Sequence, residues 1–281
     1  MAAWRRLTFH HPPGVGEELL VALHELGCLG VEPAPCTARA YFQEDAPLDR
    51  VRALPLSDPA LQGVHLLAEE IVPDGRWHEA WLDSLPPIPV GRRLLIVPGR
   101  APAAPADGRI RILLTPGRAF GTGEHATTRA CLEMLESHAG PGRSMLDAGT
   151  GSGILAIAAR LLGCDPVAAF DTDPESVEVA ARNARLNGTG AGSSRPIRFF
   201  AGGMGALRAA RFDLVTANLT GATLARLLPG LGALTARAAI LSGILAEEED
   251  AIVRAAEEAG LEVTLRSAGG DWRTLLAARR A

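Results

Sequence analysis

A glycine-rich turn at residues 147–153 constrains the fold of this 281-residue chain more than any other feature. The segment reads Met145-Leu146-Asp147-Ala148-Gly149-Thr150-Gly151-Ser152-Gly153. An apolar run ends in an acid and leads through three alternate glycines into an apolar stretch of helical period, which predicts a strand, a tight turn and a helix. Glycine suits such a turn because the backbone bends sharply and a ligand can approach where a side chain would block it. Alone, the triplet fits an ordinary glycine turn before a helix equally well.

The spacing of these glycines separates two kinds of cofactor. Gly149, Gly151 and Gly153 follow G-x-G-x-G, whereas a dinucleotide fingerprint is G-x-G-x-x-G. The observed variant therefore disfavours a nicotinamide dehydrogenase and suits a cofactor without a pyrophosphate. Further along, an apolar run at 167–170 ends in Asp171, which is well placed at the next strand tip to hold a ribose hydroxyl pair. Together the two signals predict S-adenosyl-L-methionine as the cofactor.

Strand and helix patterns alternate after the turn and predict an α/β fold. A helix is predicted to start at Asp173-Pro174 and to stop at Asn187-Gly188, and a strongly apolar strand at 212–219 contains Asn218 near its end. Further helices and strands, among them a strand at 238–242, follow to residue 278. Such alternation implies a doubly wound, Rossmann-like sheet that binds ligands at the carboxyl ends of its strands. Asp147, Asp171 and Asn218 all fall at such ends, so we expect them to bind the cofactor together with Gly149, Gly151 and Gly153 of the turn.

The first seventy residues show a different pattern. Strands and helices follow in the order β-α-β-β-α-β, which is typical of a small α+β ferredoxin-like domain. An amphipathic stretch with Trp77 and Trp81 four residues apart then predicts a linker helix that ends in a proline-rich segment. We therefore divide the chain into an α+β domain at 1–73, a linker helix at 74–90 and a catalytic domain at 91–281.

Composition excludes several classes of protein. The formal net charge of -4 shows no basic excess, so no nucleic-acid partner is required. The 4 cysteines are scattered without a C-x-x-C pair, which argues against a zinc site or a disulfide framework, and we expect no metal. No apolar run is long enough to span a membrane and no signal-peptide core is present. We expect a cytoplasmic protein without membrane contact.

Five motifs together resemble one family closely, the bacterial methyltransferases of large-subunit ribosomal protein eleven. Besides the glycine turn, they are Phe120-Gly121-Thr122-Gly123 with Thr127-Thr128, Asp171-Thr172-Asp173-Pro174, Ala217-Asn218-Leu219, and Leu241-Ser242-Gly243-Ile244-Leu245. The resemblance covers residues 115–272. The linker helix also fits, whereas the first seventy residues match only in the order of their elements.

The resemblance implies a class I S-adenosylmethionine-dependent methyltransferase. It implies that Thr128, Gly149, Asp171 and Asn218 contact the cofactor, while the loop Phe120 to Gly123 closes beside its methionine end. Family members trimethylate lysine side chains and an N-terminal α-amino group of the ribosomal protein. The resemblance further implies that the N-terminal domain recognises that protein. We expect the enzyme to act as a monomer.

Methyl transfer to an amine needs a neutral nucleophile aimed at the methyl group, so positioning supplies most of the rate. We place the catalytic role at Asn218 and Leu219, where the Asn218 side chain and nearby backbone carbonyls accept hydrogen bonds from the amine. Glu124 or His125 could assist the loss of a proton, or could be solvent-facing loop residues.

Three other functions stay open from the residues. The chain could methylate lysines of a different protein, methylate a small-molecule amine, or bind the cofactor without turnover as a ribosome-assembly factor.

Overall fold

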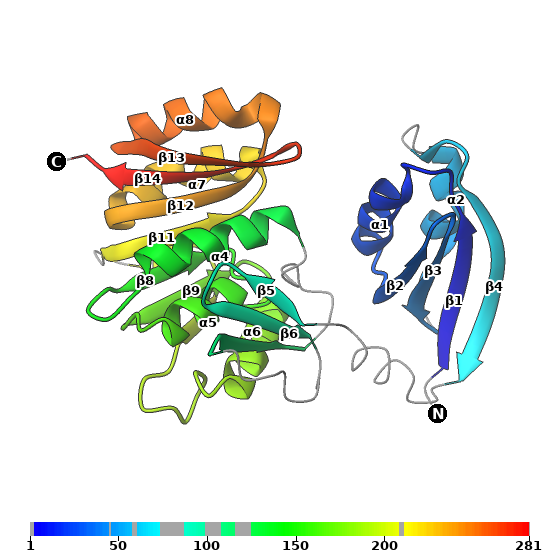
Figure 1. Cartoon of the computed structure of the whole chain (residues 1–281), viewed down its shortest axis with the longest axis horizontal. Coiled ribbons are helices and arrows are strands. Elements are labelled where there is room, and N and C mark those ends of the chain that lie inside the picture. The colour runs from blue at the N-terminus through cyan, green and yellow to red at the C-terminus, as the bar shows by residue number, and fades with distance from the viewer. Residues whose placement is uncertain are drawn as a thin grey trace. The chain divides into compact units, whose positions relative to one another are not determined.

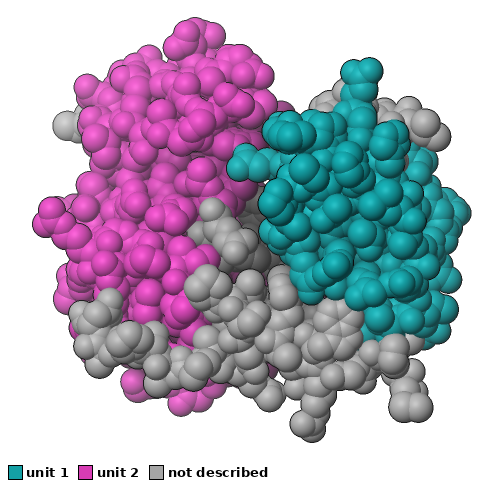
Figure 2. Space-filling view, turned by 45° about the vertical axis from the view of Figure 1, so that its right-hand side comes forward, with its two compact units in different colours: residues 1–81 teal, residues 82–281 magenta. Residues whose placement is uncertain are grey.

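The computed structural model describes residues 3–44, 46–57, 61–73, 87–98, 108–115, 125–207 and 211–280. The chain divides into two compact units, residues 1–81 and 82–281, shown in different colours in Figure 2. The expected linker helix with Trp77 and Trp81 lies outside the described residues.

Unit 1 is a four-stranded antiparallel sheet with two helices on one face (Figure 1). The strand order is β2-β3-β1-β4. In chain order the elements are β1 (Ala3–His10), α1 (Gly16–Glu25), β2 (Gly30–Ala34), β3 (Thr37–Gln43), α2 (Asp49–Ser57) and β4 (His65–Pro73). Leu7 and Phe9 of β1 share one apolar core with Leu19 and Leu23 of α1 and with Val51 of α2, so both helices cover the same face of the sheet.

The main sheet of unit 2 has seven strands in the order β10-β9-β8-β11-β12-β14-β13. These strands are β8 (Met145–Ala148), β9 (Val167–Asp171), β10 (Arg198–Ala201), β11 (Phe212–Asn218), β12 (Thr235–Leu245), β13 (Leu261–Gly269) and β14 (Trp272–Arg279). The first five in spatial order pair in parallel, whereas β14 runs antiparallel to both β12 and β13. Chain order reverses between β8 and β11, which makes that pair the topological switch point, where doubly wound sheets bind ligands.

Helices cover both faces of this sheet. They are α4 (Ala126–His138), α5 (Ile154–Leu161), α6 (Pro174–Leu186), α7 (Gly221–Leu234) and α8 (Glu249–Glu258), with short 3-10 turns η2 (Met204–Ala206) and η3 (Ala246–Glu248). Leu132 of α4 shares one apolar core with Met145 of β8, whereas Leu228 of α7 and Ile252 of α8 share another with Leu146. Because successive strand residues point to opposite faces, Met145 and Leu146 place these two cores on opposite sides of the sheet.

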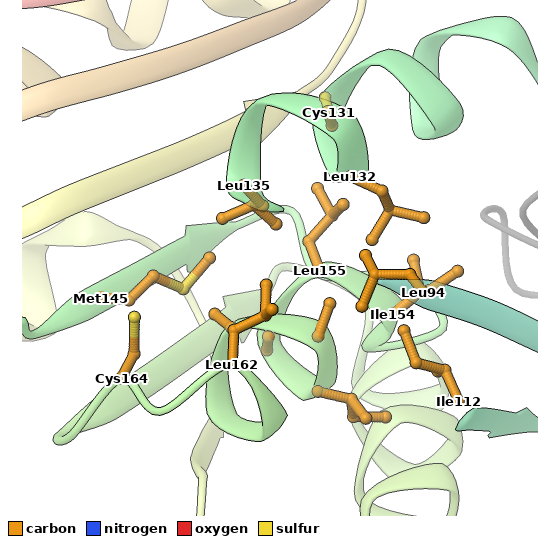
Figure 3. Close-up of a cluster of buried hydrophobic side chains, with 14 of the residues drawn as sticks. Leu94, Ile112, Cys131, Leu132, Leu135, Met145, Ile154, Leu155, Leu162 and Cys164 are labelled. Atoms are coloured by element: carbon orange, nitrogen blue, oxygen red, sulfur yellow. The ribbon is translucent and has the colours of Figure 1, made fainter. Parts of the chain in front are cut away.

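A small third sheet adds a further layer beside α4 and α5. It consists of β5 (Ile88–Val90), β6 (Leu94–Pro98) and β7 (Ile110–Leu114) in the order β5-β6-β7. Leu94 and Ile112 pack into the core that contains Leu132, Ile154 and Leu155 (Figure 3). Helix α5 therefore lies between two sheets, which explains why a helix that is apolar all round its first six residues is stable there. Strand β5 occupies the last three residues of the range expected for the linker.

Candidate functional site

The glycine turn joins β8 to α5 at the switch point. Gly149, Gly151 and Gly153 have φ values of 74°, 51° and 82°, a left-handed region that L side chains rarely adopt. The N–H groups of Gly149 and Thr150 both donate to the carbonyl oxygen of Phe170, at 2.9 and 3.0 Å. The turn is therefore fixed to the end of β9, and glycine is required at each bend.

The Asp147 side chain fixes the glycine turn by a hydrogen bond from Thr150. Its side chain is 1 % exposed, and one carboxylate oxygen accepts the Thr150 hydroxyl at 2.8 Å while the other accepts the Thr216 hydroxyl at 2.6 Å. Burial raises the pKa of Asp147 from 3.8 to about 6, against the opposing effect of the two hydroxyl hydrogen bonds. The carboxylate thus connects β8, the turn and β11, and it is enclosed by them.

Asp171 is the last residue of β9 and lies half-buried beside the turn. One carboxylate oxygen accepts the Gly151 N–H at 3.0 Å, and the other accepts the Asp173 N–H at 3.1 Å. A carboxylate offers about four lone-pair positions, so these two bonds leave capacity for further donors. Asp173 caps α6 by accepting two backbone N–H bonds, and Pro174 follows at the first helical position, as the sequence predicts.

Asn218 ends β11 on the other side of β8 from Asp171. It pairs with Ser242 of β12, and its side-chain amide donates to the hydroxyl of Thr128 on α4 at 3.5 Å. Thr128 is 1 % exposed. This contact orients the amide, so that its carbonyl oxygen becomes the end that can accept a hydrogen bond. The structure therefore brings two predicted site residues, Asn218 and Thr128, into contact.

His125 begins α4 as its N-cap. Its Nδ1 accepts the Thr127 N–H at 3.4 Å and lies 2.7 Å from the Thr127 hydroxyl, and its ring meets Trp272 edge-on at a centroid distance of 5.1 Å. Burial lowers the pKa of His125. His125 is thus a half-buried capping residue. Phe120, Gly121, Thr122, Gly123 and Glu124 lie outside the described residues.

Two site-supporting residues were missed by the sequence reasoning. Thr216, the partner of Asp147, stands two residues before Asn218, so both point to the same face of β11. A polar residue at this alternate position in an apolar strand was the available signal. Asn183 of α6 is fully buried, accepts the Thr115 N–H at 2.9 Å and donates to the Ser152 carbonyl at 2.8 Å. No local pattern predicts that contact, since it joins residues distant in sequence.

Within the described ranges, no group of three or more His, Cys, Asp or Glu side chains is arranged to hold a metal ion. In the same part of the chain, no helix combines the length and the apolar character needed to cross a membrane.

The fold and the glycine turn at its switch point define the chain as a class I S-adenosylmethionine-dependent methyltransferase. A family model described as ribosomal protein L11 methyltransferase (PrmA) matches residues 30–280. The chain belongs to this family.

Individual relatives agree with this assignment. The ribosomal protein L11 methyltransferase of Synechococcus sp. (strain RCC307) is 37% identical over 99% of this chain and 98% of its own length. The protein of that name from Pseudomonas aeruginosa (strain LESB58) is 35% identical over 99% of each chain. The crystal structure of ribosomal protein L11 methylase from Lactobacillus delbrueckii subsp. bulgaricus superposes with a TM-score of 0.63 at 33% identity, over 69% of this chain and 99% of that one.

Proposed function

We propose that this protein transfers methyl groups from S-adenosyl-L-methionine to amino groups of ribosomal protein L11, namely lysine side chains and the N-terminal α-amino group. The observation that carries the proposal is the switch-point geometry, in which Asp171 and Asn218 flank one glycine turn. The chain aligns along nearly its whole length with proteins named for L11 methylation. We place this reaction in the cytoplasm, where ribosomal proteins are made, and expect a monomer that needs no nucleic acid.

The described residues fit the cofactor in two respects. The Asp171 carboxylate keeps acceptor capacity for a ribose hydroxyl pair, and its hydrogen bond from the Gly151 N–H places the backbone of the glycine turn directly beside that carboxylate. We infer that Gly149, Gly151 and Thr128 complete the binding surface, and that Asp147 acts through the turn without touching the cofactor. When bound, the cofactor supplies a methyl group on a sulfonium, which is activated for transfer without a metal. We extend the surface to the loop at 120–123 and to Gly153 on the family resemblance.

Asn218 is the group that we propose holds the acceptor amine. Its amide nitrogen is engaged by Thr128, so its carbonyl oxygen accepts an N–H from the amine and directs the lone pair. A lysine ammonium must release a proton to solvent water before it can attack, and transfer from water to this half-buried strand end favours the neutral form. Leu219 follows in the chain and supplies an apolar wall next to this position.

Recognition of the substrate is proposed for unit 1. Its antiparallel sheet of order β2-β3-β1-β4, with both helices on one face, leads us to propose a ferredoxin-like module at 1–73. We retain the proposed division into this module, a linker at 74–90 and a catalytic domain at 91–281.

The test is a methylation assay with purified, unmethylated L11, read by mass spectrometry of its peptides. All 28 basic residues of this chain are arginines and none is lysine, so every methyl-lysine found must come from the added substrate. We expect increments of single methyl groups at L11 lysines and at its N-terminus. Methylation of a different protein or of a small amine, with L11 untouched, would redirect the substrate assignment. Cofactor binding without any turnover would point to an assembly factor instead.

A further inference from the structure

Leu219 is held between two glycines that are far apart in the sequence. A Cβ built on Gly149 would lie 2.4 Å from one methyl carbon of Leu219 and 3.2 Å from its Cγ. Real Cβ atoms do not approach other carbons so closely. The Leu219 side chain therefore packs directly on the backbone of Gly149, and any larger residue at 149 would displace it. The turn and the segment that follows Asn218 are therefore in direct contact.

Gly243 makes the second and closer approach. A Cβ there would lie 2.3 Å from the Leu219 carbonyl oxygen and 2.8 Å from its carbonyl carbon. These are backbone atoms, which cannot rotate away as the tip of a side chain can. Gly243 has φ +81°, and the pairing of β12 with β14 shifts register between Ser242 and Ile244. The glycine thus forms a bulge that lets the chain after Asn218 pass close to β12.

Ser242 fixes the same region by hydrogen bonds. Its carbonyl oxygen accepts the Leu219 N–H at 2.9 Å, and its hydroxyl lies 2.6 Å from that of Thr274. The same hydroxyl lies 3.5 Å from the carbonyl of Thr127, the residue before Thr128. Thr128 in turn accepts a hydrogen bond from the Asn218 side-chain amide. Ser242 therefore contacts both the residue after Asn218 and the first turn of α4, the helix that carries Thr128.

We propose that the Ser242–Gly243 pair is a positioning element that sets the Asn218–Leu219 segment against the cofactor turn. The proposal rests on the proposed function, in which Asn218 holds the acceptor amine. Asp171 lies on the opposite side of β8, and its hydrogen bond to Gly151 involves neither β11 nor β12. A substitution at Ser242 or Gly243 should therefore disturb the orientation of the acceptor amine more than the binding of the cofactor.

The experiment compares Gly243→Ala with Gly142→Ala. Gly142 has φ +76°, and a Cβ there would meet nothing within 4 Å, so this control carries the same backbone strain without the contact. We measure kcat and KM for L11, the Kd for S-adenosylhomocysteine by calorimetry, and the melting temperature. We expect Gly243→Ala to lower kcat by about 10- to 100-fold. Its Kd should stay close to that of Gly142→Ala, which keeps wild-type kcat.

A second variant, Ser242→Ala, tests the proposal even when Gly243→Ala does not fold. It removes the hydroxyl contacts and adds no bulk, and we expect kcat to fall by about 3- to 10-fold at unchanged Kd. Wild-type kcat in a folded Gly243→Ala or Ser242→Ala protein overturns the proposal, as does a loss of cofactor affinity equal to the loss of kcat. Absence of L11 methylation by the wild-type protein contradicts the proposed function instead, so the two failures are distinct.

Discussion

Two aspartates in the same sequence context have different surroundings in the folded chain. Asp147 and Asp171 each follow an apolar run in the sequence, and both lie within the strands β8 and β9 beside the glycine turn. Asp147 is enclosed and its oxygens accept two hydroxyls, whereas Asp171 is half-buried and accepts two backbone N–H groups. The difference arises because Asp147 lies inside its strand, where Thr150 of the turn and Thr216 of β11 cover its carboxylate, whereas Asp171 is the last residue of β9.

The enclosed carboxylate predicts a dependence of stability on pH. The pKa of Asp147 is higher in the folded state, about 6, than its ordinary value of 3.8, so the folded protein binds the proton more tightly. Its contribution to stability is therefore present at low pH and is lost as the pH rises through about 6. Between about pH 5 and pH 7.5, the free energy of unfolding of wild type should fall by about 1 kcal/mol relative to that of Asp147→Asn.

Urea denaturation of both proteins at the two pH values measures this difference. The variant Asp271→Asn, which changes an exposed acid of the same unit, is the control and should track the wild type. A wild-type-minus-Asp147→Asn difference that is constant with pH would show that burial does not perturb this group.

Asn218→Ala tests the proposed holding of the amine. Without the side-chain carbonyl the amine loses its directing acceptor, and we expect kcat for L11 to fall by about 100-fold. Affinity for S-adenosylhomocysteine should change far less, because Asp171 and the turn stay in place. Steady-state kinetics and calorimetry on the same preparation measure both quantities. Full turnover by the variant with the cofactor bound would remove Asn218 from the mechanism.

At the scale of elements, the α/β order of unit 2 was predictable because each helix carries its own signals. Asp173 with Pro174 predicts the start of α6 and Asn187 with Gly188 its end, and both predictions are confirmed. The predicted strand at 238–242 is shorter than β12, which extends to Thr235 and Leu245 through its pairing with β11 and β14. The length of a central strand depends on its neighbours, and local sequence does not contain that information.

The sequence likewise predicts some residues of the candidate site and not others. The three strand-end residues could be predicted because the carboxyl ends of parallel strands meet at one edge of a sheet. The Asn218 to Thr128 contact could not, since it depends on how α4 lies across β11. The same holds for Asn183 of α6 and for Asn187, the residue that caps the end of α6, whose side chains hydrogen-bond the backbone at the end of β7.

These two asparagines lead to a prediction about α6. Asn183→Ala removes a fully buried side chain that hydrogen-bonds both Ser152 of the glycine turn and Thr115 after β7. We expect the free energy of unfolding to fall by roughly 2 to 4 kcal/mol, and the affinity for S-adenosylhomocysteine to fall as well. Asn187→Ala is the matched control, because its side chain bonds only to β7 and to Asn183 of the helix that it caps.

Urea denaturation and calorimetry measure both effects. The control should lose stability while its affinity for the ligand stays at the wild-type value. Equal ligand affinity in the two variants would mean that the bond from Asn183 to the turn has no influence on the site.

At the scale of the whole molecule, the two units have separate apolar cores. Phe9 is fully buried in unit 1, whereas the switch-point residues all belong to unit 2. Phe9→Ala should destabilise unit 1 by about 3 to 5 kcal/mol. We expect L11 methylation to be lost while the affinity for S-adenosylhomocysteine is retained, because unit 1 is proposed to recognise the substrate and not the cofactor.

Calorimetric unfolding, calorimetric titration and the methylation assay on the full chain test this separation. The parallel variant Leu228→Ala, in the core of unit 2, should instead lower ligand affinity. Loss of ligand binding in Phe9→Ala would show that the cofactor site depends on unit 1.

The position of β14 has a consequence for synthesis of the chain. β14 follows β13 in sequence, yet in the sheet it lies between β12 and β13. While the polypeptide emerges from the ribosome, β13 therefore has no strand to pair with until β14 has been translated. A nascent chain at that stage carries an unpaired β13 segment, and β13 joins the sheet only when β14 pairs with both β13 and β12.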